Sequence, residues 1–153
     1  TFKATAKVFF SEEEFINALE KNQITKDDFI IIKYQGESIG CPEMLFPTSA
    51  LVGYFGDNAP PLATDGRFSG GSKGILIAHL PDAYKKESLT EIIETGDTII
   101  IDLNNNSLNI DLNQHTIEMR KNKVISTIPN IKKGYLSKYK KLVGNLSTGF
   151  STI

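Results

Sequence analysis

The sequence is poor in cysteine, in long apolar runs and in net charge. Its 153 residues contain one cysteine, Cys41, so an internal disulfide is excluded, and one thiol cannot by itself hold a zinc ion or an iron–sulfur cluster. No run approaches the roughly 18 apolar residues that a membrane span needs. The first ten residues lack the basic and apolar regions of a secretion signal. We therefore expect a cytoplasmic protein without a membrane segment.

The length suits one domain, because a chain of this size buries roughly two thirds of its unfolded surface and builds a core without disulfides. We therefore expect residues 1–153 to form a single domain. The formal charge of −1 conceals an uneven distribution, since all 18 Asp and Glu lie at or before Glu118. Eight of the 17 bases follow it: Arg120, Lys121, Lys123, Lys132, Lys133, Lys138, Lys140 and Lys141.

The last part of the chain, residues 130–153, is predicted to be a basic helical tail. Such a tail can bind nucleic acid through phosphate contacts. It can equally be a solvated helix face or a segment that docks on an acidic partner, and these are the simpler interpretations. Because the tail has neither zinc-ligand spacing nor an RNA-recognition signature, we expect no nucleic-acid partner.

Apolar patterning predicts about six short strands with a few helices between them. We expect strands at residues 2–10, 29–34, 62–63, 75–80, 98–102 and 108–112. We expect helices at about residues 12–21, 49–54, 113–121 and 135–143. Strands and helices do not alternate regularly, which favours a mixed α/β, barrel-like domain with peripheral helices over a doubly wound parallel sheet.

Local signals set three of these boundaries. Ser11, with Glu14 three residues later, forms the capping box that opens the first helix. Pro47 disfavours helical angles at the residue before it, so we expect the second helix to start only after it, capped by Thr48 or Ser49. Three successive asparagines, residues 104–106, tolerate left-handed angles and predict a β-hairpin.

A long polar loop at residues 64–74 contains four glycines, two of them adjacent. Glycines let backbone N–H groups converge on an anion, and Arg67 and Lys73 add positive charge. The spacing matches neither the P-loop nor the dinucleotide fingerprint. From composition alone, an anion site and an ordinary glycine-rich turn with surface bases are comparable interpretations.

A second polar segment, residues 40–50, carries Glu43 in a proline-bounded loop. A carboxylate there can ligate a hard metal ion, although a lone glutamate is more often a solvated or capping acid. Nearby residues have plain structural interpretations. His79, on an expected apolar strand, is interpreted as a hydrogen-bonded core histidine, and Cys41 as a small buried thiol.

Taken together, the segments Pro42-Glu43-Met44-Leu45, residues 47–53 and residues 64–74 resemble the C-terminal domain of the dihydroxy-acid dehydratase and phosphogluconate dehydratase family. The resemblance extends through Gly96-Asp97-Thr98 to Gly134-Tyr135-Leu136 and so covers essentially the whole chain. The sequence Arg67-Phe68-Ser69-Gly70-Gly71 is closer to the dihydroxy-acid branch than to the phosphogluconate branch.

The resemblance implies a swivelling β/β/α barrel-like domain that closes over an N-terminal domain of the same enzyme. That enzyme is a hydro-lyase that converts a 2,3-dihydroxy carboxylate to a 2-keto acid, as in branched-chain amino-acid biosynthesis, and acts as a homodimer. By position, Glu43 matches a magnesium ligand and Ser69 the base that takes the C2 proton. Arg67, Gly70, Gly71 and Ser72 would line the substrate.

The resemblance also implies Mg²⁺ and an iron–sulfur cluster whose cysteines lie in the N-terminal domain, so we expect the isolated chain to be inactive. The chain departs from the family at residues 34–41, which are shorter and poorer in glycine, and at Lys73, where arginine is usual. Two alternatives therefore stay open. One is a phosphogluconate or other sugar-acid dehydratase, and the other is a freestanding domain that binds an anion or a partner without catalysis.

Overall fold

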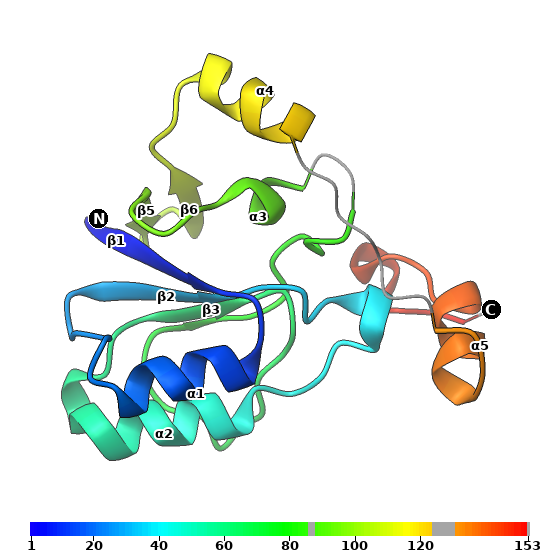
Figure 1. Ribbon diagram of the computed structural model, residues 1–153, viewed down its shortest axis with the longest axis horizontal. Helices are drawn as coiled ribbons and strands as arrows, with labels where there is room; N and C mark the ends of the chain where they lie inside the picture. The colour runs from blue at the N-terminus through cyan, green and yellow to red at the C-terminus, as the bar shows by residue number, and fades with distance from the viewer. Residues whose placement is uncertain (86–87, 124–130, 153) are drawn as a thin grey trace.

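The computed structural model describes residues 1–85, 88–123 and 131–152. It shows a mixed α/β domain built on one curled six-stranded sheet, a half-barrel in the order β4-β3-β2-β1-β5-β6 (Figure 1). The strands are β1 (Phe2–Phe9), β2 (Asp28–Ile32), β3 (Leu62–Thr64), β4 (Leu76–Ile77), β5 (Thr98–Asp102) and β6 (Ser107–Ile110). The predicted fold class, a mixed barrel-like sheet with peripheral helices, is confirmed.

The first four strands run parallel, whereas β5 and β6 are antiparallel to their neighbours. The register aligns the strand ends, because Phe9 pairs with Ile32 and Ile32 pairs with Thr64. The loops after β1, β2 and β3 therefore leave the sheet along one edge. In sheets with parallel strands, ligands bind at this carboxyl edge, and the two polar segments singled out in the sequence follow β2 and β3, respectively.

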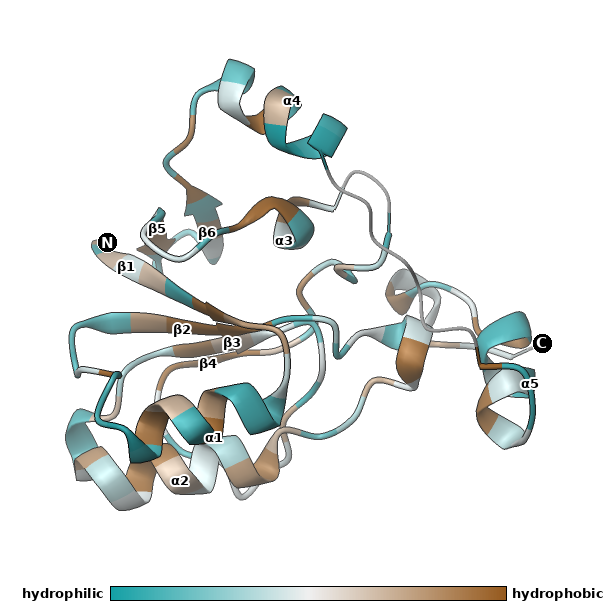
Figure 2. Cartoon of the chain, in the orientation of Figure 1, coloured by the Kyte–Doolittle hydropathy of each residue, from teal (hydrophilic) through white to brown (hydrophobic). Residues whose placement is uncertain are grey.

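The core lies on both faces of the sheet, as the unbroken apolar run in β2 predicts. Ile30 and Ile32 pack with Phe15 of α1 on one face, while Phe29 and Ile31 pack with Ile99 on the other. Each fully buried side chain of this size contributes roughly 1.5–3 kcal/mol. Figure 2 shows hydrophobic residues concentrated along these central strands, whereas α5 is largely hydrophilic.

The described part of the chain has five α-helices: α1 (Glu12–Glu20), α2 (Leu45–Phe55), α3 (Leu89–Ile92), α4 (Gln114–Lys123) and α5 (Tyr135–Leu142). There are also three short 3₁₀ turns, Glu37–Ile39, Gly56–Asn58 and Leu146–Thr148. The helices α1 and α2 lie side by side on one face, while α3 and α4 lie on the other (Figure 1). No helix in the described ranges is long and apolar enough to cross a membrane.

The capping box and the hairpin are confirmed. Ser11 Oγ accepts the N–H of Glu14 at 3.1 Å, and Glu14 Oε2 accepts the N–H of Phe10 at 2.7 Å. In the hairpin, Asn106 has the expected left-handed angle, φ 50°, and Asp102 accepts the N–H of Asn105. The predicted basic tail contains α5 and the last 3₁₀ turn, but residues 130 and 153 lie outside the described residues.

Two predicted boundaries are wrong. The helix α2 begins at Leu45, so Pro47 lies in its first turn, where its missing N–H has no intrahelical partner to lose. Thr48 is inside the helix and its Oγ1 donates to the Leu45 carbonyl at 2.8 Å. The strand expected at residues 75–80 is only Leu76–Ile77, because the chain then turns at His79, φ 58°.

Candidate active site

Two loops meet at the carboxyl edge of the sheet through backbone hydrogen bonds. Arg67 N–H donates to the Pro42 carbonyl at 3.1 Å, and Met44 N–H donates to the Arg67 carbonyl at 2.8 Å. These bonds form a parallel bridge between Glu43 and Arg67. The structure therefore brings together a predicted metal ligand and a predicted substrate-binding residue that lie 24 positions apart in the chain.

The contact between these loops needs a glycine. A Cβ on Gly66 would lie 2.9 Å from the Pro42 carbonyl oxygen and 3.1 Å from Gln35 Cβ, closer than side chains pack. We call residues 64–67, which carry this contact, the loop base. Residues 68–72, which follow it, are called the loop tip.

The carboxylate of Asp65 connects the loop base to its neighbours. It accepts backbone N–H groups of Gln35 at 2.8 Å, Ala83 at 2.9 Å and Tyr34 at 3.2 Å. The side chain is almost fully buried. Desolvation raises the pKa of Asp65 to about 6, although the three N–H groups oppose the rise. Asp65 is therefore ionised at neutral pH and holds two other loops against the site.

A second buried carboxylate, that of Asp82, also connects neighbouring loops through backbone N–H groups. It accepts the backbone N–H groups of Ser38 and Tyr84, each at 2.8 Å. A Cβ on Gly36 would lie 2.5 Å from Asp82 Cγ, so this approach also depends on glycine. The two aspartates together order the segment of residues 34–38.

The loop tip is held far more loosely. Ser69, Gly70 and Gly71 are exposed, and Ser72 is half-buried. Ser72 N–H donates to the Ser69 carbonyl at 3.2 Å, and Ser72 Oγ lies 3.4 Å from Thr48 Oγ1. A Cβ on Gly70 would meet nothing within 4 Å, and one on Gly71 only Ser69 Oγ at 3.9 Å. Packing within the described part of the chain therefore does not require these glycines.

The charged side chains of the site are open to solvent. Glu43 and Arg67 are both exposed, and neither forms an ion pair with a described residue. Lys73 does not join them. It lines a small hollow with Val52 and Asp57 at the end of α2. A solvent-facing carboxylate and guanidinium can thus bind a cation and an anion, respectively, without first breaking a bond within the domain.

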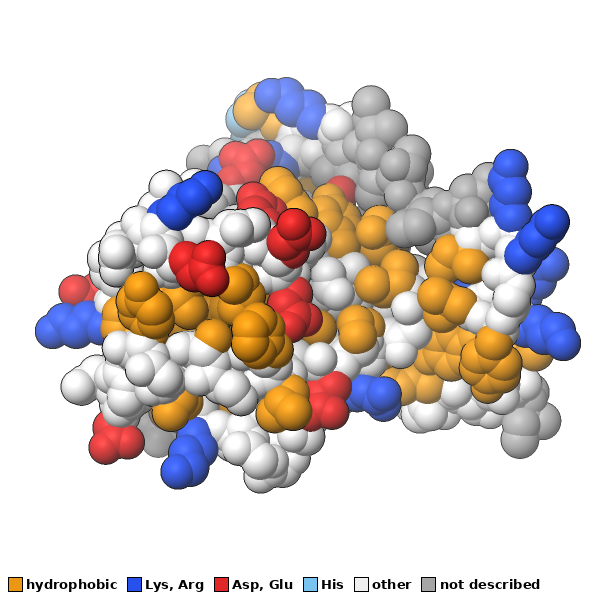
Figure 3. Space-filling view, turned by 60° about the horizontal axis from the view of Figure 1, so that its bottom comes forward, with side chains coloured by type: hydrophobic (Ala, Val, Ile, Leu, Met, Phe, Trp, Pro, Cys, Tyr) orange, Lys and Arg blue, Asp and Glu red, His pale blue; other side chains and the backbone are white. Residues whose placement is uncertain are grey.

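The surface around the site is rich in exposed apolar side chains. Leu45 and Phe46, directly after the Glu43 loop, are 49% and 60% exposed, and Phe46 lines a hollow with acids of α1. Tyr135 of α5 is 83% exposed. Figure 3 shows two such apolar areas on this face, one bordered by acidic and the other by basic side chains. Exposed apolar patches of this kind are typical of surfaces that contact another protein part, a membrane or a ligand.

Cys41 and His79, near the site, were both predicted to be buried residues with a structural role. The prediction is confirmed for Cys41 only. Cys41 is buried, as expected, and burial raises the pKa of its thiol, which keeps it protonated and inert. The interpretation of His79 as a core residue is wrong, because the ring is exposed. Its Nδ1 lies 4.0 Å from Cys41 Sγ, and its ring contacts Phe150.

The side chains of this chain fit only one of the two cofactors that the family resemblance implies. No group of three or more His, Cys, Asp or Glu that could hold a metal ion occurs among the described residues. Glu43 fits as one carboxylate ligand, since Mg²⁺ is usually held by one or two carboxylates together with water and substrate. An iron–sulfur cluster does not fit this chain, because it needs several thiolates and the one cysteine is buried.

Three buried ionic residues near the site were not singled out in the sequence: Asp65, Asp82 and Lys33. Lys33 Nζ donates to the carbonyls of Glu91 at 2.6 Å and Ile93 at 3.2 Å, and desolvation lowers its pKa. It ties the end of β2 to the segment before β5. The available signal was position, since Lys33 and Asp65 directly follow buried strands.

Comparisons with known proteins identify the family of this chain. The family model described as "Dihydroxy-acid/6-phosphogluconate dehydratase C-terminal" matches residues 1–150. The chain is 43% identical over 146 residues to a dihydroxy-acid dehydratase of Methanococcus maripaludis and 42% identical over 154 residues to one of Francisella tularensis subsp. novicida. It is 41% identical over 152 residues to the mitochondrial dihydroxy-acid dehydratase of Saccharomyces cerevisiae.

These matches cover 94%, 99% and 97% of this chain, respectively, but only 26%, 27% and 26% of the relatives. The chain therefore spans about a quarter of the length of the curated relatives it matches. With a family match over nearly every residue and the two motif loops joined at the carboxyl edge, the chain belongs to the dihydroxy-acid/6-phosphogluconate dehydratase C-terminal domain family.

Proposed function

We propose that this chain is the C-terminal catalytic domain of a hydro-lyase that converts a 2,3-dihydroxy carboxylate to a 2-keto acid, as dihydroxy-acid dehydratase does. The observation that carries the proposal is the Glu43–Arg67 bridge, which sets the loop of the proposed metal ligand beside the loop of the proposed base. The named relatives, all dihydroxy-acid dehydratases, favour this substrate class over a sugar acid.

In the proposed reaction, Ser69 Oγ takes the proton from C2 of the substrate. The electron pair of the C2–H bond forms the C2=C3 double bond and expels the C3 hydroxyl, which takes the proton back from Ser69 and leaves as water. The resulting enol then rearranges to the 2-keto acid. A free serine hydroxyl is a poor base, so its alkoxide needs nearby donors or positive charge. The backbone N–H groups of Gly70 and Gly71, with the Arg67 guanidinium, are the groups in this loop that can provide them. Ser72 completes the substrate-binding set.

Glu43 is the residue of this chain that would hold Mg²⁺, and bound Mg²⁺ supplies Lewis-acid polarisation of substrate oxygens. The remaining magnesium ligands and the iron–sulfur cluster belong, in this proposal, to an N-terminal domain of the same enzyme. Isolated residues 1–153 are accordingly inactive. Their exposure of Glu43, Arg67 and Ser69 supports a site that is completed by another part of the protein.

The proposed partner of the site surface is that N-terminal domain, within a homodimeric full-length enzyme. Exposed Leu45, Phe46 and Tyr135 around the site support a covered surface. Partial coverage of the relatives supports the presence of further domains. A cytoplasmic location, without nucleic acid or membrane as a partner, stays a prediction, and one relative is named mitochondrial.

The direct test is an activity assay of the full-length protein after anaerobic reconstitution with iron, sulfide and Mg²⁺. We expect turnover of 2,3-dihydroxyisovalerate to its 2-keto acid and little turnover of 6-phosphogluconate. A preference for 6-phosphogluconate would contradict the proposed substrate class but not the proposed dehydratase reaction. A reconstituted protein that holds its cluster but dehydrates neither compound would contradict the proposal.

A further inference from the structure

Four residues that are neither glycine nor asparagine have left-handed backbone angles in the described part of the chain, which is uncommon for such residues. They are Tyr34 with φ 69°, Cys41 with φ 50°, His79 with φ 58° and Phe150 with φ 56°. The two asparagines with such angles, Asn22 and Asn106, are of a type that tolerates them. The four other residues therefore mark places where the backbone is strained.

The strained residues gather around the loop base. Tyr34 N–H donates to the Asp65 carboxylate at 3.2 Å, and Cys41 Sγ lies 3.8 Å from the Asp65 carbonyl oxygen. His79 N–H donates to the Gly66 carbonyl at 3.0 Å, and the fourth strained residue contacts the ring of His79. Strained backbone persists where the surrounding structure holds it, and it clusters at functional sites. The loop base is thus a place to look for a further functional residue.

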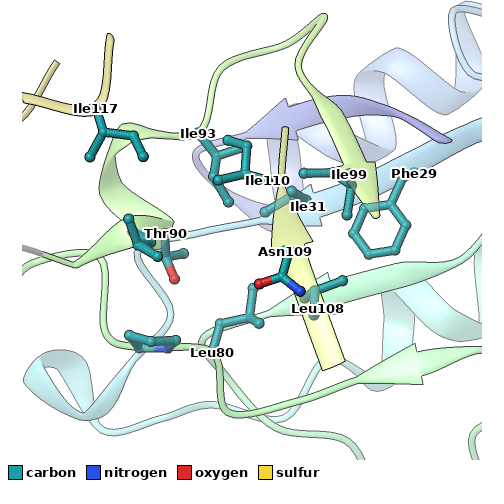
Figure 4. Close-up of a pocket in the computed structure, with 12 residues that line it drawn as sticks. Phe29, Ile31, Leu80, Thr90, Ile93, Ile99, Leu108, Asn109, Ile110 and Ile117 are labelled. Carbon is teal, nitrogen blue, oxygen red and sulfur yellow. The ribbon is translucent and has the colours of Figure 1, made fainter. Parts of the chain in front are cut away.

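His79 is the one residue of the four whose side chain is both exposed and ionisable. Its Nδ1 lies 4.0 Å from Cys41 Sγ, and its Nε2 has no hydrogen-bond partner among the described residues. The next residue, Leu80, lines an apolar cavity of about 320 Å³ together with Phe29 and Ile31 (Figure 4). His79 does not line this cavity, which has no charged side chain in its lining. Nε2 is therefore available to a ligand at the carboxyl edge.

The guanidinium of Arg67 lies on the same side of the loop base as His79. Arg67 directly follows Gly66, whose carbonyl accepts the His79 N–H, and both side chains are exposed. Desolvation raises the pKa of the Cys41 thiol and the charge of Arg67 opposes the rise, so the guanidinium is within electrostatic reach of the thiol that the His79 ring contacts. A guanidinium and an imidazole N–H that converge in this way suit a carboxylate.

We propose that His79 is a further substrate-binding residue, whose Nε2 donates a hydrogen bond to the carboxylate of the substrate beside Arg67. The inference rests on the proposed function, because the proposed substrate is a carboxylate. Both the neutral ring with its proton on Nε2 and the imidazolium can donate this bond. The role accounts for an exposed ring that is held on a strained backbone, since the strain fixes the direction of the ring before the substrate arrives.

The variant His79→Asn of the reconstituted full-length protein tests the proposal. Asparagine tolerates the left-handed angle, but its amide is too short to reach the place of Nε2. The probe is 2-hydroxyisovalerate, which keeps the carboxylate of 2,3-dihydroxyisovalerate but has no C3 hydroxyl to lose, so its binding is measured without turnover. We expect its dissociation constant to rise about 10- to 100-fold, as for loss of a hydrogen bond to a charged group.

The other readouts separate binding from folding. The KM for 2,3-dihydroxyisovalerate should rise by a similar factor with a smaller change in kcat, as for lost ground-state binding. The thermal midpoint should stay at or above the wild-type value, because the substitution relieves backbone strain. His115→Asn, which removes an exposed histidine of α4, is the matched control and should change none of these quantities.

Three results would overturn the inference. They are a dissociation constant in His79→Asn within twofold of the wild-type value, no binding of the probe by the wild-type protein, and a midpoint that falls by several degrees in both His79→Asn and His79→Gly. Glycine adopts left-handed angles freely, so a loss in both variants would assign the ring to folding. A wild-type protein that binds the probe but dehydrates no substrate would contradict the proposed function alone, and the dissociation constant of His79→Asn would still decide the inference.

Discussion

The base and the tip of the glycine loop are adjacent in sequence but differ in how they are held. In the loop base, Asp65 accepts three backbone N–H groups, Gly66 packs against the Pro42 carbonyl, and Arg67 forms a two-bond bridge. In the loop tip, Gly70 and Gly71 face open space. The base is thus explained by folding of this domain, whereas the tip has a composition that folding does not require.

The difference between the loop base and the loop tip indicates which part of the loop is available for chemistry. Glycine loses more conformational entropy on folding than other residues do, so it is expected where close approach or an unusual backbone angle requires it. At Gly66 that demand is internal to the domain. At Gly70 and Gly71 no described residue imposes it, which agrees with close approach of a substrate to the backbone at the tip. Substitutions and pH can therefore separate the two regions.

The largest expected effect comes from pH acting on the loop base. Desolvation raises the pKa of Asp65 to about 6 in the folded protein, against about 3.9 in an unfolded chain. The folded state therefore binds the additional proton between these values. Through this group, the free energy of unfolding falls as pH rises from about 4 to 6, by about 3 kcal/mol in all, and then levels off.

Urea unfolding at several pH values measures this dependence, with Asp65→Asn as the matched variant that cannot titrate. The variant should lose that part of the slope between pH 4 and 6. An unchanged slope in Asp65→Asn would assign the dependence to other groups. It would also show that burial does not raise the pKa of Asp65 in the folded protein.

A smaller loss is expected from Gly66→Ala. The added Cβ would lie 2.9 Å from the Pro42 carbonyl oxygen, so the two loops must separate and the Glu43–Arg67 bridge must weaken. We expect a loss of about 2 kcal/mol of stability, typical of overpacking at a tight contact. Urea unfolding of the variant checks it, and a loss below about 0.5 kcal/mol, the range of ordinary surface changes, would contradict the close-approach argument.

The smallest effect on stability is expected from Gly71→Ala in the loop tip. Its Cβ would meet only Ser69 Oγ, at 3.9 Å, and the backbone angle there is not in the left-handed region. Stability should change by no more than about 0.5 kcal/mol. A loss as large as that of Gly66→Ala would show that the tip is also constrained by folding, and the contrast between the two regions would disappear.

Much of the fold was predictable because it follows from local patterns. The apolar run of β2, the capping box at Ser11 and the asparagine turn each specify an element through nearby residues. Pro47 misled the prediction, because a proline only disfavours helical angles at the residue before it, and Phe46 is helical all the same in the first turn of α2. The strand at residues 75–80 was overestimated, because loop hydrogen bonds to Gly66 and Thr64, distant in sequence, decide where β4 ends.

The site was predictable only in part. Glu43 and Arg67 were named from motifs, but their adjacency depends on a bridge between loops that no periodicity reveals. Asp65 and Asp82 were missed because a buried carboxylate and a solvated one look alike in sequence. They differ only in the backbone N–H groups that the fold supplies. The catalytic role of Ser69 stays a prediction that rests on family resemblance.

The most direct test of the account is the turnover number of Ser69→Ala in the reconstituted full-length protein, measured together with its thermal midpoint. On the proposal that Ser69 is the general base, kcat should fall by about 1,000-fold or more. The midpoint should stay at the wild-type value, since Ser69 Oγ bonds to no described residue. Turnover at the wild-type rate would contradict the account.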